Sequence, residues 1–578
     1  MSMYTREGTP PDSEMKAACE TEKTTSLNPS AATQLPVSTN CLACSEDGRY
    51  LGLGHALGLS VWSASSLLCA AEWKQDALEV TSIQMTAMGE SAYMLGAVDD
   101  MGVARVFAYH REAIHPLSVI NTMENINKRS ICLTFELSEG GDYAAASISC
   151  NGAAWLEVFH LPSEAWLKEM ETAQKQDPNS SEDVDMKWSP VAVVIKIKPP
   201  KNPAGPLDGP LELFRTTDWF SRLSAQEVDR DAGNTKEKSE SPPRCTQHFL
   251  WPCGPFPGGS KAKPAGGPVA VSVWWSGSQN LLQYSLHKAP KNKTDVEPVP
   301  DVLWPNAKTI LCSAVSRCSR FVALGLEGAL VCVWDRKSGS PLSVVMVTAA
   351  DSDFSRMQFV DNCPDIGPDH DADVSQTFPA ATVCVLLLCK SGATHTVTAG
   401  RGTQTLQRSE RPKEGGDIPA VAAPVAFLQS LSLVVQRNGE MFLQDIINRS
   451  RVCSLMLPTT HRTATPCVPV YALSTEQQTL YIRGDQDSGC AASSEAGSQL
   501  FIFRFGESDI IRRWIVSLPD SPRQLNTPSY ETLEDSCNLY LQQRALSVDE
   551  RNDALTQTWK QLQETAATLQ QTRKNCSS

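Results

Sequence analysis

Residues 321–335 have the sequence FVALGLEGALVCVWD, and this stretch predicts the fold of the whole chain. An apolar run is followed by Glu327 and Gly328, and then by a second apolar run that ends in Trp334 and Asp335. A glycine between two such runs favours a tight turn between antiparallel strands, because glycine adopts positive φ values at little cost. The stretch therefore predicts a two-stranded hairpin.

The same arrangement recurs along the chain. Residues 45–74 contain a Ser-Glu-Asp-Gly turn and two expected strands, the second of which ends in Val61 and Trp62. Weaker copies cover residues 92–108, 143–159, 269–284, 382–397, 431–443 and 468–503. Self-similarity at intervals of roughly 40–45 residues is typical of a β-propeller, in which each repeat forms one four-stranded blade. We predict an all-β propeller of about seven or eight degenerate blades.

The regions outside this pattern define the expected domain organisation. Residues 1–36 are polar and predict a disordered N-terminal tail, residues 37–516 the propeller, and residues 517–578 a short helical C-terminal tail. Insertions that are rich in charge, Pro, Gly or Ser interrupt the propeller near residues 171–188, 225–267 and 361–378. Their composition favours disordered loops.

The C-terminal tail contains a predicted amphipathic helix. Residues 547–550 have the form of a capping box. Apolar residues then follow at intervals of three and four positions, at Leu555, Trp559, Leu562, Ala566 and Leu569. This spacing places them on one stripe of a helix, which packs either on its own propeller or on a partner protein, and the pattern favours neither. Leu555, Trp559, Leu562 and Leu569 are therefore candidate partner-docking residues.

Composition and charge narrow the class of protein. The formal net charge is −14 and the pI is about 5.2, which argues against nucleic acid or an anionic membrane as the partner. The chain contains no run of eighteen apolar residues and no secretory signal in its first thirty residues, so we expect a cytoplasmic protein. Its 19 cysteines are then expected to be reduced, as small buried side chains.

Motifs for catalysis, cofactors and metals are weak in this sequence. Cys41 and Cys44 form a lone CxxC pair with no second pair at zinc-site spacing, so we expect them to pack within a blade. Asp369, Asp371 and Asp373 alternate as in a calcium loop but lack its glycine and its bidentate glutamate. The Gly-x-Ser-x-Gly nucleophile motif is missing. We predict no catalytic, cofactor or metal site, and no enzymatic activity.

With its blade pattern, the chain resembles the WD-repeat propeller family. The most specific residues are the pentapeptide VCVWD at 331–335, Val61 with Trp62, and the turn at 45–50. The resemblance implies that Trp62, Trp334 and Asp335 are structural blade anchors. In the family pattern a Trp, a turn Asp, a strand Ser or Thr and a loop His also form a hydrogen-bonded group that stiffens each blade. This sequence departs from the family pattern, because Glu327 stands where an Asp is expected and no matching His is evident.

Residues 41–62, 98–110 and 128–162 are similar to a group of WD-repeat proteins associated with motile cilia. This similarity implies a non-enzymatic scaffold in the central apparatus of the axoneme, located in the cilium and bound to other central-apparatus proteins rather than to nucleic acid, membrane or a small-molecule substrate. A second hypothesis is a substrate-receptor adaptor of a cullin ubiquitin ligase. Such propellers carry Trp-Asp-x-Arg, and residues 334–337 match it except that Lys337 stands in the Arg position.

Overall fold

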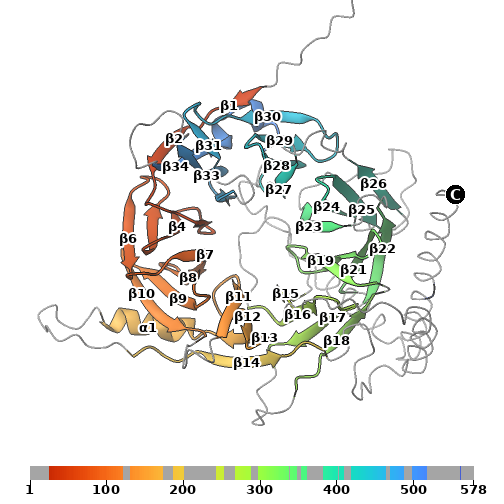
Figure 1. The fold of residues 1–578 in the computed structure, drawn as a ribbon, viewed down its shortest axis with the longest axis horizontal. Coiled ribbons are helices and arrows are strands. Elements are labelled where there is room, and N and C mark those ends of the chain that lie inside the picture. Colours follow the sequence, from red (N-terminus) through yellow and green to blue (C-terminus); the bar gives the residue numbers. More distant parts are fainter. Residues whose placement is uncertain are drawn as a thin grey trace, which may run out of the picture.

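The described strands of the computed structural model form eight sheets arranged as a ring around a central opening (Figure 1). This arrangement confirms the predicted all-β propeller. The structure describes residues 25–121, 130–173, 187–200, 243–252, 267–287, 297–306, 308–337, 339–347, 353–360, 382–400, 403–408, 418–463, 469–486 and 497–516, together with Lys560.

Blades 1 to 4 each contain four antiparallel strands that follow one another in the chain. Blade 1 consists of β3 (Cys41–Cys44), β4 (Tyr50–His55), β5 (Gly58–Ser63) and β6 (Cys69–Lys74). Blade 2 consists of β7 (Val80–Met88), β8 (Ala92–Asp99), β9 (Ala104–His110) and β10 (Ala113–Val119). Blade 3 consists of β11 (Ser130–Leu137), β12 (Tyr143–Cys150), β13 (Ala153–His160) and β14 (Ala192–Ile197). Blade 4 consists of β15 (Cys245–Leu250), β16 (Ala270–Trp275), β17 (Asn280–Ser285) and β18 (Val302–Pro305).

Blades 5 to 8 complete the ring. Blade 5 consists of β19 (Ile310–Val315), β20 (Phe321–Leu326), β21 (Leu330–Asp335) and β22 (Ser340–Met346). Blade 6 consists of β23 (Phe354–Val360), β24 (Val383–Cys389), β25 (Thr394–Gly400) and β26 (Thr403–Arg408). Blade 7 consists of β27 (Pro419–Pro424), β28 (Leu431–Gln436), β29 (Met441–Asp445), β30 (Arg451–Leu455) and, at its edge, β1 (Ser26–Leu27). Blade 8 consists of β31 (His461–Thr463) and β32 (Tyr471–Ser474), which both pair with β33 (Thr479–Gln486), then β34 (Ser498–Arg504) and β2 (Ala31–Gln34).

The stretch at 321–335 folds as the predicted hairpin of β20 and β21. Phe321 pairs with Asp335 and Leu326 with Leu330, and Gly328 has φ = +82° in the turn. Every residue of both strands is buried. Middle strands of a blade are covered on both faces by the neighbouring blades, so they have nearly continuous apolar runs rather than an alternating pattern.

The N-terminal segment closes the ring. β2 pairs antiparallel with β34, with Ala31 opposite Ile502 and Gln34 opposite Gln499, while β1 pairs parallel with β30 of blade 7 (Figure 1). Leu35, just after β2, is buried. The expectation that residues 1–36 form a disordered tail is therefore wrong for residues 25–36, because β34 presents an open edge that this segment fills.

Two expected insertions also need correction. Residues 245–250, which we placed in the insertion at 225–267, form β15, the innermost strand of blade 4. Residues 171–173, which we placed in the insertion at 171–188, end helix α1 (Ser163–Ala173). Trp166 of α1 is fully buried and its Nε1 donates to the Ser189 carbonyl at 2.8 Å, so the helix is fixed to the segment that leads into β14. The insertion at 361–378 lies outside the described residues.

After β34 the described chain ends near blade 7. The short helices η4 (Phe505–Glu507) and α3 (Asp509–Arg512) bury Phe505 and Ile511 in the blade 7 core, and the Val516 amide donates to the Phe427 carbonyl at 3.1 Å. The expected helical tail at 517–578 lies outside the described residues, except Lys560. Within the described part of the chain, none of the helices has both the length and the apolarity that crossing a bilayer requires.

We expect removal of residues 1–36 to destabilise the propeller, because the edge of β34 and apolar side chains such as Ile502 would lose their cover. Thermal unfolding of the truncated protein should show a lower Tm than that of the full chain. Removal of residues 1–24 is the matched control, since it spares both strands. An unchanged Tm after the longer truncation would show that β2 does not close the ring.

Candidate protein-interaction site

Trp334, a predicted blade anchor, lies on β21 with only 4% of its surface exposed. Its indole Nε1 donates to the Oδ1 atom of Asn306 at 3.2 Å, and its ring meets that of Trp304 edge to face at 5.4 Å. Trp304 lies on β18 of blade 4, and Asn306 lies just after that strand, in the connection to blade 5. Trp334 therefore connects blade 5 to blade 4 through packing and one buried hydrogen bond.

Asp335, the second predicted anchor, is buried beside Arg320. Two guanidinium nitrogens, Nε and Nη2, donate to its carboxylate at 3.1 and 3.0 Å, and the Lys337 amide donates to it at 3.0 Å. A bidentate arginine pair of this kind is geometrically specific. The turn after β21 is therefore held to Arg320, which directly precedes β20.

Sequence reasoning missed Asn306 and Arg320. Arg320 directly precedes β20 and Asp335 ends β21, so the hairpin register already implied that they lie side by side. Asn306 belongs to the connection between two blades, and no local pattern marks it.

Trp62, the third predicted anchor, lies at the equivalent place on β5 but is only partly buried. Its Nε1 donates to Ser60 Oγ on the same strand at 2.9 Å. The structure thus places all three predicted anchors at the ends of third strands, in blades 1 and 5. The docking residues predicted in the tail, Leu555, Trp559, Leu562 and Leu569, lie outside the described residues.

The Trp-Asp-x-Arg-like motif of the ligase hypothesis lies at the end of β21. Arg336 donates within the chain, to the carbonyls of Ser319 and Trp251, and Lys337 is exposed. The adaptor function stays a hypothesis that rests on the motif alone.

Cys41 and Cys44 lie on β3, as expected, with free thiols. Burial raises the pKa of the Cys41 thiol to about 12 and that of Cys44 to about 11, so both are protonated at neutral pH. Metal ligation requires thiolates. Among the described residues, no three His, Cys, Asp or Glu side chains are grouped to hold a metal ion.

A cleft of about 350 Å³ lies between blades 2 and 3. Its walls come from β7, β8, the turn between β8 and β9, and β11. Three large apolar side chains at this cleft are exposed: Met101 by 41%, Ile131 by 41% and Leu133 by 43%. A group of exposed apolar side chains at one place is typical of a protein-interaction site. Sequence reasoning could not find it, because Met101 is remote in sequence from the other two.

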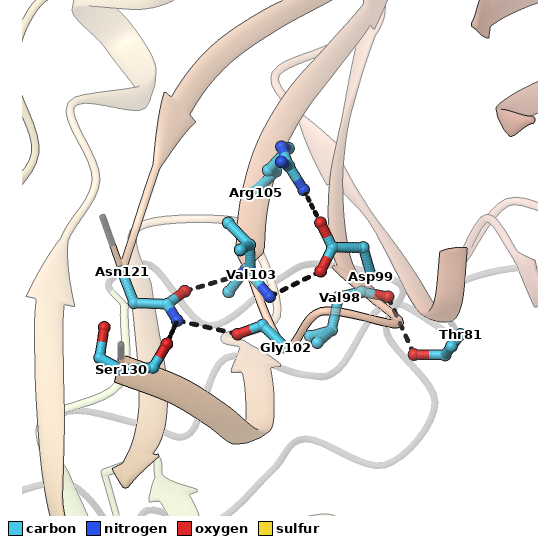
Figure 2. A network of polar contacts seen from close by, with 9 residues as sticks. Thr81, Val98, Asp99, Gly102, Val103, Arg105, Asn121 and Ser130 are labelled. Atoms are coloured by element: carbon cyan, nitrogen blue, oxygen red, sulfur yellow. Dashed lines mark hydrogen bonds and ion pairs between the residues drawn. The ribbon is translucent and has the colours of Figure 1, made fainter. Parts of the chain in front are cut away.

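The turn that carries Met101 is held by side-chain hydrogen bonds, as Figure 2 shows. The carboxylate of Asp99, at the end of β8, accepts the Val103 amide at 2.7 Å and pairs with Arg105. Thr81 Oγ1 donates to the Val98 carbonyl at 3.1 Å. These contacts join the turn to both strands that it connects and to the innermost strand of blade 2.

The same turn is joined to blade 3. The Gly102 carbonyl accepts hydrogen bonds from Asn121 Nδ2 and from the Cys132 amide, each at 2.8 Å (Figure 2 shows the former). Asn121 also donates to the Ser130 carbonyl at 3.1 Å and accepts the Ala104 amide at 2.7 Å. Both walls of the cleft are thus fixed relative to each other, which lowers the entropic cost of binding.

The charged side chains that line the cleft are acidic. Asp99 is offset by Arg105, whereas Asp100 is exposed on the turn, and its amide donates to the Glu79 carbonyl at 2.8 Å. The lining contains no Lys or Arg among the described residues. The cleft therefore favours apolar side chains that are accompanied by positive charge.

We expect Trp334→Ala to destabilise the propeller by about 3–5 kcal/mol, the usual cost of removing a large buried aromatic side chain. Trp62→Ala should cost less, because Trp62 is only partly buried. Urea unfolding followed by circular dichroism would measure both. Equal and small effects would contradict an anchoring role for Trp334.

Gly102→Ala should destabilise the turn for two reasons. Gly102 has φ = +72°, which costs an L-residue about 1–2 kcal/mol, and a Cβ there would lie 2.5 Å from Ile131 Cγ2, which adds roughly 1–3 kcal/mol of overpacking. Gly152→Ala is the matched control, because Gly152 has φ = +80° with no atom near its Cβ position. If the two variants unfold at the same denaturant concentration, Ile131 does not pack tightly on the turn.

Several solved propellers resemble this structure. Saccharomyces cerevisiae Sqt1 matches with a TM-score of 0.45 and 8% identity, over 83% of this chain and 99% of that chain. The Dos1 propeller matches with a TM-score of 0.44 and 9% identity, over 82% and 94%. Chaetomium thermophilum Sqt1, bound to the N-terminus of ribosomal protein L10, matches with a TM-score of 0.42 and 12% identity, over 83% and 100%.

A protein-family model gives the more specific result. The model described as WD repeat-containing protein 93 matches residues 39–331, just over half of the 578 residues. This region extends from just before β3 into β21 and includes the cleft between blades 2 and 3. On this match and on the eight-bladed propeller, the chain belongs to the WD repeat-containing protein 93 family.

Proposed function

We propose that this protein is a non-enzymatic scaffold of the motile-cilium axoneme that holds central-apparatus proteins on its propeller. The family and the fold support a protein-interaction scaffold. The ciliary location rests on the similarity of residues 41–62, 98–110 and 128–162 to WD-repeat proteins of motile cilia.

The observation that carries the proposal is the cleft between blades 2 and 3. Met101, Ile131 and Leu133 expose apolar surface there, on a turn and a strand that internal hydrogen bonds hold in place. We infer that the occupant is a segment of a partner protein that inserts apolar side chains and carries Lys or Arg beside them, facing Asp100. Stable protein interfaces bury roughly 1,200–2,000 Å² in total, so this cleft would form the centre of a larger contact.

The proposal is tested by pull-down from extracts of isolated axonemes with the full chain as bait. We expect central-apparatus proteins to be enriched with the native protein and depleted with the variant Met101→Lys/Leu133→Lys, because two lysines add repulsion where apolar contact is needed. Leu68→Lys is the matched control, since Leu68 is 68% exposed on blade 1, away from the cleft.

Two outcomes would contradict parts of this proposal, and a third would require a different variant. Enrichment of proteins from the soluble cytoplasmic pool only would contradict the axonemal location. Equal recovery with the cleft variant and with Leu68→Lys would contradict the cleft as the docking site. A lowered Tm of the cleft variant would attribute its loss of partners to unfolding, and Leu133→Lys alone would then replace it.

A further inference from the structure

A second hollow lies at the central opening of the ring, beside blades 4 to 7. It has a volume of about 470 Å³ and is lined by the innermost strands β15, β19, β23 and β27 of blades 4 to 7, which border the opening in Figure 1. The turns after β19 and β27 complete it. A volume of this size is in the range of ligand pockets, roughly 300–1,000 Å³.

Two arginines give this cavity its charge. Arg317, on the turn after β19, and Arg356, on β23, are both exposed. Among the described residues, neither forms an ion pair with a carboxylate, and no Asp or Glu lines the cavity. Arg356 makes a hydrogen bond with the Tyr471 hydroxyl of blade 8. The cavity is therefore locally basic, although the net charge of the chain is −14.

The rest of the cavity wall is uncharged and contains both polar and apolar side chains. Burial lowers the pKa of His248 to about 4, so its ring is uncharged at neutral pH, and its Nε2 lies 2.7 Å from Ser313 Oγ. Ser313 also accepts the indole N–H of Trp274 at 2.8 Å, which fixes this part of the wall. Phe359 adds apolar surface, and the buried Gln358 Oε1 has no hydrogen-bond partner among the described residues.

We propose that this cavity binds a carboxylate-rich peptide segment of a partner protein, with Arg317 and Arg356 as its charge partners. Guanidinium groups bind carboxylates through two parallel hydrogen bonds, and partly enclosed sites strengthen such contacts. The cavity holds two cationic groups and an apolar wall, which fits a few acidic residues with their alkyl stems. The inference goes beyond the scaffold function, because it stands on the cavity alone and does not depend on a ciliary location.

The test uses fluorescein-labelled hexaglutamate and the full-length protein, with binding measured by fluorescence anisotropy. We expect binding that weakens as salt is raised and that falls at least about tenfold in Arg317→Gln/Arg356→Gln, the effect of losing one or more charged contacts. Arg437→Gln is the matched control, because Arg437 is exposed on the turn after β28 and is not part of the cavity. Thermal unfolding of each variant establishes that it is folded.

Loss of binding in the double variant with retention in Arg437→Gln supports the proposal. Absence of hexaglutamate binding, equal binding by the native protein and the double variant, or equally tight binding of labelled hexalysine would overturn it. These outcomes are independent of the axonemal pull-down, so failure of either proposal is distinguishable from failure of the other.

Discussion

The pairing of β2 with β34 is the contact on which the rest of the structure depends. A propeller places each blade between two others, so the first and last repeats must meet, and an open strand edge at that point would expose unpaired backbone groups. Here a segment from the N-terminus supplies the outermost strand of blade 8 and, through β1, an extra strand on blade 7. The two ends of the propeller are thereby joined by backbone hydrogen bonds.

Within the closed ring, apolar packing between blades tolerates much variation in sequence. The blade 5 hairpin ends in Trp334 and Asp335, as in the family pattern. Blade 2 has Phe107 in a position similar to that of Trp334, and Phe107 is likewise buried. What such packing requires is apolar volume on both faces of the middle strands rather than any one residue. This explains how repeats can be degenerate, and how a helix such as α1 can be inserted between β13 and β14 without interrupting the sheet.

The ring carries two hollows with linings of different chemistry. Successive turns of an antiparallel meander alternate between the two faces, so the turn between β8 and β9 lies on one face and the turns after β19 and β27 lie on the other. The first site is apolar and acidic, around Met101 and Asp100, and the second is basic, around Arg317 and Arg356. A scaffold with unlike sites on opposite faces can hold two different partners at once, because neither excludes the other.

The sequence by itself determined the propeller and its approximate blade number, because strand hairpins and their turns are local patterns. It also predicted Trp62, Trp334 and Asp335 as blade anchors, and the structure places each at the end of a third strand. The sequence also made Arg320 accessible to prediction, since hairpin register places it beside Asp335. Only the tertiary structure decided that residues 25–36 close the ring, that residues 245–250 form a strand, and that Asn306 is the partner of Trp334. It alone placed Met101 and Leu133 at one cleft, and Arg317 and Arg356 at one cavity. Each of these contacts joins segments of different blades, and such proximity depends on how the blades are placed around the ring rather than on any pattern along the chain.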